Sequence, residues 1–257
     1  MNWMRYRVIY VIISTIFVGA GIFSLFKWGL NLGIDFTGGV VAEYKMPNGE
    51  IIKVTDESLR EEYKGQGAEE VRFEKVGPSI GPELVKKTIY ALVTSAILIL
   101  LWVAYQFKSI KFGVAATLAT LHDSLVLLGM FSLLGHFFGA EIDFLFVTAM
   151  LTILSFSVHD TIVVFDRIRE NSRKSKEDLK TIANKALTQT LVRSINNSAT
   201  IIFMLLSLIL MGGDTIKWFA VALLMGTISG TYSSPFVAVP ILVTWDELAS
   251  KSKSPKI

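Results

Sequence analysis

Two aspartates lie inside long apolar runs of this chain, and they are the residues best suited to chemistry there. Asp160 lies near the end of a run that starts near Ile142, and Asp123 lies within the preceding run. An ionised carboxylate in hydrocarbon costs at least about 2.5–3.5 kcal/mol, so such residues usually face a bundle interior or a water-filled path, often as proton relays. Each Asp follows a His and precedes a hydroxyl residue, Ser124 or Thr161. This shared sequence context of the two aspartates suggests that the two helices are related and line one polar route.

Arg193 is the expected companion of Asp160. Asp160 lies about 9 Å inside the basic boundary at Asp166, at 1.5 Å per residue, and Arg193 opens the fifth apolar run on the same side. The two side chains are therefore expected to meet at similar depth. A carboxyl group holds its proton more tightly when buried and less tightly beside a cation, so an Asp that moves between these environments loads and releases a proton. The alternative is a static buried ion pair.

Asp123 has two interpretations, a structural contact between helices or a participant in transport. Two His and two Asp on neighbouring helices supply ligand types for a metal. Adjacent helical residues point about 100° apart, however, so His122 and Asp123 do not share a face, and no metal site is expected. Each His is more simply a hydrogen-bonded packing residue. With no cysteine and no nucleophile–base motif, neither an enzyme nor a cofactor is predicted.

The composition is that of a polytopic membrane protein. The 257 residues are 52% hydrophobic and 18% charged, against about 25% charged in soluble domains, and no basic patch typical of nucleic-acid binding is present. Six runs reach the roughly 20 residues that a membrane helix needs. The fifth reaches that length only by including Arg193, Asn196 and Asn197. The predicted spans are residues 8–28, 88–107, 112–135, 142–165, 192–212 and 216–244.

Lys and Arg in the short loops predict the orientation, because they concentrate on the cytoplasmic side. Arg5 and Arg7 precede the first span, the loop 166–191 is basic, and Lys residues follow the last span. Both termini are therefore expected in the cytoplasm. The predicted domains are 1–28 (N-terminus and first span), 29–86 (extracytoplasmic), 87–245 (five further spans) and 246–257 (cytoplasmic tail).

The segment 29–86 is the one sizeable part outside the membrane in this topology. Val40–Met46 and Ile51–Val54 are predicted strands around a Pro47-Asn48-Gly49 turn, a helix extends to Lys64, and Val71–Val76 is a third strand. This β-β-α-β pattern predicts a small α+β domain. The fold class is thus an α-helical polytopic membrane protein with six transmembrane helices and this domain between the first two. Alone, the segment 31–39 is typical of a flexible exit from the membrane, with glycines that allow tight turns.

Three segments together resemble the SecF family, part of the bacterial SecDF protein-export complex in the resistance-nodulation-division superfamily. They are the stretch Gly33-Ile-Asp-Phe-Thr-Gly-Gly39, the pair His122-Asp123, and the stretch Asp160-Thr-Ile-Val-Val-Phe-Asp-Arg-Ile-Arg-Glu-Asn171. The signature residues are Gly33, Asp35, Phe36, Thr37, Gly38, Gly39, Asp166, Arg167, Arg169, Glu170 and Asn171.

The resemblance implies a multi-pass subunit of the bacterial inner membrane that uses the proton motive force. Its implied partners are SecD, the SecYEG channel, the translocating preprotein and the lipid bilayer, with no nucleic acid. It implies that Asp160 is the essential acid, Arg193 its companion, and Asp123 and Asn197 members of the relay. His159 and Asn197 depart from the family, which often has Asn and a hydroxyl residue there. The alternatives are a small-molecule or lipid exporter of the same superfamily and a passive assembly scaffold.

Overall fold

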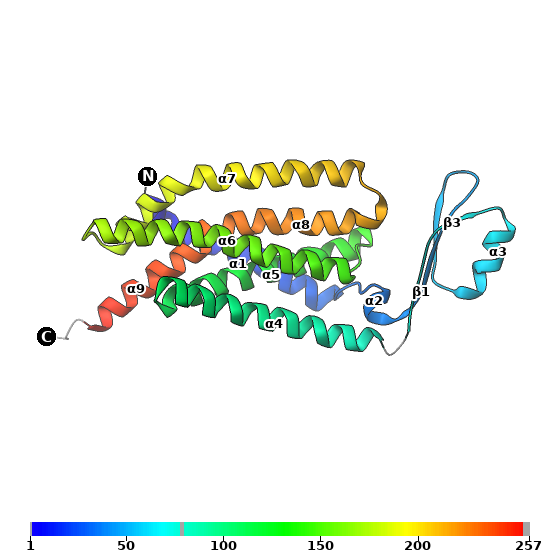
Figure 1. The fold of residues 1–257 in the computed structure, drawn as a ribbon, viewed down its shortest axis with the longest axis horizontal. Coiled ribbons are helices and arrows are strands. Elements are labelled where there is room, and N and C mark those ends of the chain that lie inside the picture. Colours follow the sequence, from blue (N-terminus) through cyan, green and yellow to red (C-terminus); the bar gives the residue numbers. More distant parts are fainter. Residues whose placement is uncertain (1, 78–79, 254–257) are drawn as a thin grey trace.

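A bundle of long helices makes up most of the molecule, and a small sheet unit projects from one end of it (Figure 1). The structure is a computed structural model that describes residues 2–77 and 80–253. Both termini lie at the end of the bundle opposite the sheet. We call these two ends the domain end and the terminal end. The long helices are α1 (Arg7–Trp28), α4 (Ile80–Phe107), α5 (Ile110–Phe138), α6 (Phe144–Lys174), α7 (Leu179–Met211) and α8 (Asp214–Ser233).

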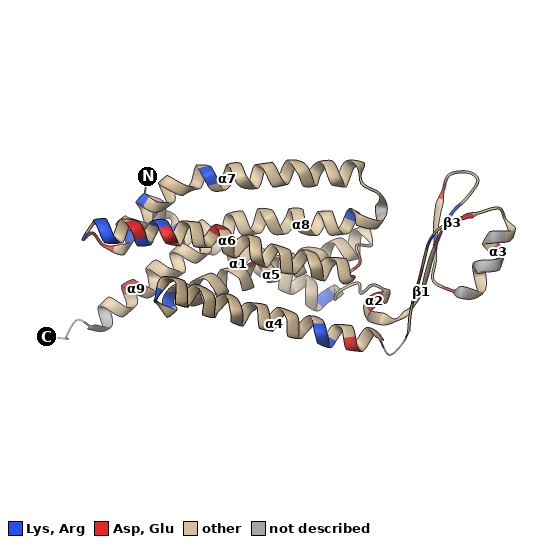
Figure 2. Ribbon diagram, viewed as in Figure 1, with Lys and Arg blue, Asp and Glu red and all other residues tan. Residues whose placement is uncertain are grey.

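Within residues 2–77 and 80–253, five helical segments are long and apolar enough to cross a membrane, so a multi-span helical architecture is confirmed. They are Trp3–Trp28, which combines the short helix η1 (Trp3–Tyr6) with α1, and α4, α5, α6 and α7. Charged side chains gather toward the two ends of the bundle and leave its middle largely free of them, as Figure 2 shows. This distribution is typical of helices that lie in a bilayer.

The predicted sixth span is an interrupted helix. After α8 the chain makes a π-helical turn, η3 (Ser234–Ala238), and continues as α9 (Val239–Lys253). Pro235 lies within the turn, and because proline has no N–H to donate, it disrupts regular helical hydrogen bonding. The interruption of the sixth span is therefore a local π turn at Pro235.

Several helix ends differ from the predicted boundaries. α4 begins at Ile80, inside the predicted range 29–86. α6 runs to Lys174 and α7 begins at Leu179, so most of the predicted loop 166–191 is helical. α9 extends into the predicted tail 246–257, of which residues 254–257 lie outside the described part of the chain. The apolar runs locate the centres of these helices, while their polar ends continue beyond the runs.

The sheet unit is a three-stranded antiparallel sheet of order β2-β1-β3. Tyr44 is fully buried and packs with Ala42 and Val54 in a small core. The α+β unit expected between the first two long helices is thus present. Its elements are α2 (Ile34–Thr37), β1 (Gly39–Lys45), β2 (Ile51–Val54), η2 (Glu57–Leu59), α3 (Arg60–Gly65) and β3 (Glu69–Val76).

The bundle contains two apolar clusters with a polar layer between them. The cluster nearer the terminal end includes Ala119, Phe165 and Leu187. The cluster nearer the domain end includes Leu127 and Ile153. Asp123 lies between Ala119 and Leu127 along α5, in the layer between the clusters, whereas Asp160 lies on α6 between Val158 and Val164 of the cluster nearer the terminal end.

Small residues bring α8 close to α6 at this layer. A Cβ added at Gly226 would lie 2.1 Å from Ile153, and one added at Gly230 would lie 3.2 Å from the Cβ of Ser157. Only residues without large side chains permit such close helix packing in membranes. The contact brings the serines of α8 within reach of α5 and α6.

Candidate functional site

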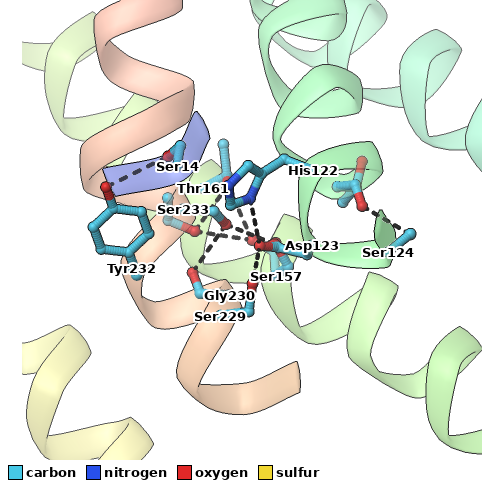
Figure 3. A network of polar contacts seen from close by, with 12 residues as sticks. Ser14, His122, Asp123, Ser124, Ser157, Thr161, Ser229, Gly230, Tyr232 and Ser233 are labelled. Carbon is cyan, nitrogen blue, oxygen red and sulfur yellow. Dashed lines mark hydrogen bonds and ion pairs between the residues drawn. The ribbon is translucent and has the colours of Figure 1, made fainter. Parts of the chain in front are cut away.

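Asp123 is the centre of a buried hydrogen-bond network, drawn in Figure 3. Its exposed fraction is 0%. Oδ2 accepts hydrogen bonds from Ser157 Oγ and Ser233 Oγ, and Oδ1 accepts one from Ser229 Oγ, each at 2.6 Å. Ser157 comes from α6, while Ser229 and Ser233 are one turn apart on α8 and share a face. One carboxylate of α5 therefore holds three helices together.

His122 adds a fourth contact to this carboxylate. Its Nδ1 lies 3.3 Å from Asp123 Oδ1, so the two side chains meet although they leave the helix in different directions. Nε2 of His122 is buried and has no hydrogen-bond partner within the described residues. Across residues 2–77 and 80–253, no three His, Cys, Asp or Glu side chains come together as a metal site would require.

Asp160 has a different environment. It accepts one hydrogen bond, from Ser194 Oγ of α7 at 2.6 Å, and it retains an exposed fraction of 5%. The expected direct contact with Arg193 is absent, because no ion pair joins these two side chains in the described part of the chain. The helix α7 turns Ser194 and Ser198 inward, and it leaves Arg193 exposed.

A hydroxyl pair connects the surroundings of the two acids. Thr161, which follows Asp160, has its Oγ1 2.9 Å from Ser234 Oγ. Both hydroxyl oxygens also lie within hydrogen-bond distance of the carbonyl oxygen of Ser157, whose side chain binds Asp123. At the start of the π turn, Ser233 therefore contacts Asp123, and the adjacent Ser234 contacts Thr161, the residue that follows Asp160.

Arg193 lines a cavity at the α6–α7 interface. The cavity has a volume of about 380 Å³. Asn197, one turn away from Arg193 on α7, is also exposed. Neither side chain reaches the acids, so the structure brings together Asp123 and Asp160 with serines rather than with the predicted cation and amide. The lining residues are Val163, Asp166, Arg167, Glu170, Gln189, Thr190 and Arg193.

The motif Gly33–Gly39 is anchored to the α5–α6 connection, which corrects the expectation of a flexible exit. Gly33 N donates to Ile142 O at 2.8 Å. The carboxylate of Asp35 accepts from the backbone N–H of Phe144, the first residue of α6, at 2.8 Å. Phe36 is buried in the cluster nearer the domain end. The motif thus fixes the start of α6, the helix that carries Asp160.

The paired glycines of this motif have a conformational role. Gly38 has φ 71° and Gly39 has φ 127°, values that disfavour residues with a side chain. They turn the chain from α2 into β1. Gly81 of α4 packs on the same turn, since an added Cβ there would lie 2.4 Å from Phe36 O. The motif therefore joins the sheet unit to two long helices.

The second signature segment, residues 166–171, ties the terminal end of α6 to its neighbours. Arg169 pairs with Asp166 at 2.5 Å and donates to Gln106 O of α4 at 2.9 Å. Arg167 pairs with Glu170 at 2.7 Å. Asn171 donates to Gln189 of α7 at 3.2 Å. These contacts surround the cavity that Arg193 lines.

The hydroxyl partners of the two acids were not among the predicted site residues. A spacing in the sequence identifies two of them, since Ser157–Asp123 and Ser194–Asp160 each join residues 34 positions apart. The separation of 34 residues between an Asp on α5 and its serine donor on α6 recurs between the Asp on α6 and its serine donor on α7. The partial match around the two His-Asp pairs belongs to this longer pattern.

The fold and the site define a helical membrane protein with two buried acids in its bundle and a small α+β unit at one end. A family model described as "Protein export membrane protein SecD/SecF, C-terminal" matches residues 55–248, and the "SecD/SecF GG Motif" model matches residues 23–46. The chain belongs to the SecD/SecF protein-export membrane protein family.

Relatives and solved structures agree with this assignment. The protein translocase subunit SecF of Thermobaculum terrenum is 51% identical to this chain. The match covers 69% of this chain and 58% of the length of that relative. The SecF subunit of Anaerolinea thermophila is 33% identical over 96% of this chain and 94% of its own length. The crystal structure of SecDF, a translocon-associated membrane protein from Thermus thermophilus, has a TM-score of 0.86 at 31% identity, covering 96% of this chain and 39% of that one.

Proposed function

We propose that this chain is a SecF-type subunit that couples the proton motive force to preprotein translocation. In this proposal it works with a SecD partner and a SecYEG channel. Family membership and the likeness to SecF subunits over most of the chain support the assignment. The likeness to SecDF, of which the chain spans 39%, supports a partner that supplies the remaining helices.

The proposal includes an orientation. The terminal end of the bundle faces the cytoplasm, and the sheet unit lies on the outer side of the bacterial inner membrane. The excess of Lys and Arg in the short loops at the terminal end supports this, because such residues are retained on the cytoplasmic side. The proposal also includes six crossings, with α8, η3 and α9 forming the sixth as an interrupted helix.

Asp160 is the proposed proton carrier, and its contrast with Asp123 is the observation that supports this role most directly. Asp123 has no exposed surface and four polar contacts, whereas Asp160 has a single hydroxyl donor and keeps some exposure. A group that exchanges protons needs access and few fixed partners. A carboxylate that accepts hydrogen bonds from several helices instead holds those helices together. In this division of roles, Asp160 exchanges protons and Asp123 stabilises the bundle.

Arg193 is the proposed companion cation in this mechanism. It is exposed at the cavity beside α6, one residue from the serine that binds Asp160. A long side chain at this position has the reach to approach the carboxylate after Asp160 loses its proton. The cation then stabilises the ionised acid, and withdrawal of the cation favours reprotonation.

Substitutions at Asp160 test the function. Asp160→Asn keeps the size of the side chain but cannot ionise, so we expect normal accumulation in the membrane and loss of proton-dependent export. Asp160→Glu keeps a titrating group and should retain part of it. The measurement is preprotein release from membrane vesicles that hold the full translocase, with and without a proton gradient.

The double variant Asp160→Asn with Arg193→Gln separates a carrier from a scaffold. Removing one member of a charge pair leaves the other uncompensated, which is often costlier than removing both. If the pair is only structural, the double variant recovers activity. If Asp160 carries protons, the double variant accumulates and remains inactive. Proton-dependent export by the double variant would refute the carrier role and favour the passive scaffold.

A further inference from the structure

The cavity at the α6–α7 interface lies close to Asp160, although Asp160 does not line it. Val163 lines it from α6, three residues after Asp160, and Thr190 lines it from α7, four residues before Ser194. A helical turn is 3.6 residues and about 5.4 Å long. The cavity therefore begins one turn from the Asp160–Ser194 hydrogen bond, on the side toward the terminal end.

The lining of the cavity is suited to water. Among its seven lining residues, only Val163 is apolar, and the others are charged, amide or hydroxyl side chains. A water molecule takes about 30 Å³ in the liquid, and polar cavities of sufficient size are hydrated whereas apolar ones stay dry. A volume of about 380 Å³ accommodates several waters.

The opposite direction along the bundle is apolar. From the polar layer toward the domain end, the interior is filled by buried side chains such as Leu127, Phe131, Phe146 and Ile153. Tightly packed apolar side chains exclude water. Toward the terminal end, an apolar cluster also fills the centre of the bundle, but in the described part of the chain the α6–α7 interface on that side of Asp160 holds the polar cavity.

The charges around the cavity favour an open entrance. Asp166 and Glu170 are each paired with a cation of their own helix. Arg193 faces the same space, and no ion pair holds it within the described residues. The α6 side of the entrance is therefore fixed by its own ion pairs, while the cation of α7 is free to move along it.

We propose that this cavity is the aqueous entrance through which Asp160 exchanges its proton with the cytoplasm, and that Thr190 lines the end of the cavity nearest to Asp160. A hydronium ion in the cavity gives its proton to the Asp160 carboxylate, leaving a carboxylic acid and a water molecule, and the reverse step releases the proton. This inference rests on the proposed function of Asp160 as a proton carrier. It adds the side of access and the residues that form the entrance.

Thiol labelling tests the entrance, because the chain has no cysteine of its own. Single variants Thr190→Cys and Gln189→Cys place a thiol in the lining. Val192→Cys, on the same helix, is the matched control, since Val192 is 68% exposed and is not among the residues that line the cavity. Thiol reagents react with the thiolate, which forms in water and not in hydrocarbon. The probe is a charged, membrane-impermeant methanethiosulfonate added to inverted vesicles that hold the full translocase.

We expect Thr190→Cys and Gln189→Cys to react from the cytoplasmic side and Val192→Cys to stay unmodified. The adduct at Thr190→Cys should abolish the proton-dependent part of preprotein export, and a reducing agent that removes the adduct should restore it. Absence of reaction at both lining positions, reaction only from the outer side, or a labelled Thr190→Cys with undiminished proton-dependent export would overturn the proposal. Failure of the proposed function is seen separately, as proton-dependent export by Asp160→Asn.

Discussion

At the scale of single residues, two acids with similar sequence contexts have opposite environments. Asp123 is closed in by donors from α6 and α8, and Asp160 meets one serine next to a polar cavity. Hydrogen bonds from three hydroxyl groups to one carboxylate are charge-assisted and therefore stronger than neutral ones, so they rigidify the packing around Asp123. A carboxyl group with a single donor can change its charge without breaking the contacts between helices.

This difference predicts opposite stability effects for the same substitution. Asp123→Asn replaces one acceptor oxygen with an amide nitrogen, so donors from Ser157, Ser229 or Ser233 lose their partner. Each buried polar group left unsatisfied costs about 1–3 kcal/mol. We expect a clear fall in the thermal unfolding temperature in detergent for Asp123→Asn, and little change for the matched Asp160→Asn. Equal unfolding temperatures for Asp123→Asn and the parent protein would contradict the structural role of Asp123.

The two acids were predictable from sequence, and their partners were not. An Asp in an apolar run stands out because its burial is costly. Hydroxyl residues are abundant in membrane helices and often bond to their own helix. Ser124 donates to Thr120 O, for example, and Thr120 donates to Ala116 O. Residue type alone therefore does not distinguish Ser157, which reaches across to Asp123, from Ser124, which does not.

At the scale of elements, the start of α6 depends on two carboxylates. Asp143 Oδ1 caps the helix by accepting from Phe146 N at 2.7 Å, and Asp35 accepts from Phe144 N. Burial raises the pKa of the Asp143 carboxyl above its usual value of 3.8, the Phe146 hydrogen bond opposes the rise, and the charge of Asp35 adds to it. The folded protein therefore holds this proton more tightly than the unfolded chain does.

The raised pKa predicts how stability changes with pH. The contribution of Asp143 is fully present below its unfolded pKa and is lost as pH rises through the raised folded pKa. Asp143→Asn keeps the capping oxygen, since Asn and Asp cap helices about equally well, but it does not titrate. Relative to the parent, Asp143→Asn should thus gain stability as pH rises from about 4, and then stay constant. The measurement is the unfolding temperature of both proteins in detergent across this range.

A control separates the cap from the charge. Asp143→Ala removes the capping oxygen, which costs about 1 kcal/mol, and it should lower stability relative to Asp143→Asn at every pH. A parallel pH dependence for the parent protein and Asp143→Asn would show that Asp143 does not titrate in the expected sense.

The elements themselves were predicted to different degrees. Hydropathy located the centre of each long helix, because burial in hydrocarbon demands about 20 apolar residues. It did not locate the ends, because backbone hydrogen bonds continue a helix through polar residues that hydropathy does not assign to a span. The polar turns that extend α6 to Lys174 are an example. The anchoring of Gly33–Gly39 on the α5–α6 connection was also missed, because it depends on residues that are distant in sequence.

At the scale of the whole molecule, the sheet unit and the bundle are joined through a few contacts. α2 packs on α4 through Phe36 and Gly81, and an ion pair links Lys53 of β2 to Glu141 in the α5–α6 connection. The small core of the sheet unit lies apart from the two clusters of the bundle. The bundle should therefore fold and insert without most of the sheet unit, provided that the motif Gly33–Gly39 is retained.

A deletion designed on the sheet register tests this division. Val41 of β1 and Glu74 of β3 are antiparallel partners, so residues 42–73 can be replaced by an Asn-Gly turn, which favours tight hairpins. We expect normal amounts of the shortened protein in the membrane but loss of export, because the proposed function needs a unit that acts on the preprotein outside the membrane. Immunoblots of membranes and the rate of preprotein maturation measure the two effects.

The control is Lys53→Ala, which removes one exposed ion pair worth about 0–1 kcal/mol and should leave export intact. Normal maturation in the deletion strain would remove the sheet unit from the mechanism, and disappearance of the shortened protein from the membrane would refute the independence of the bundle.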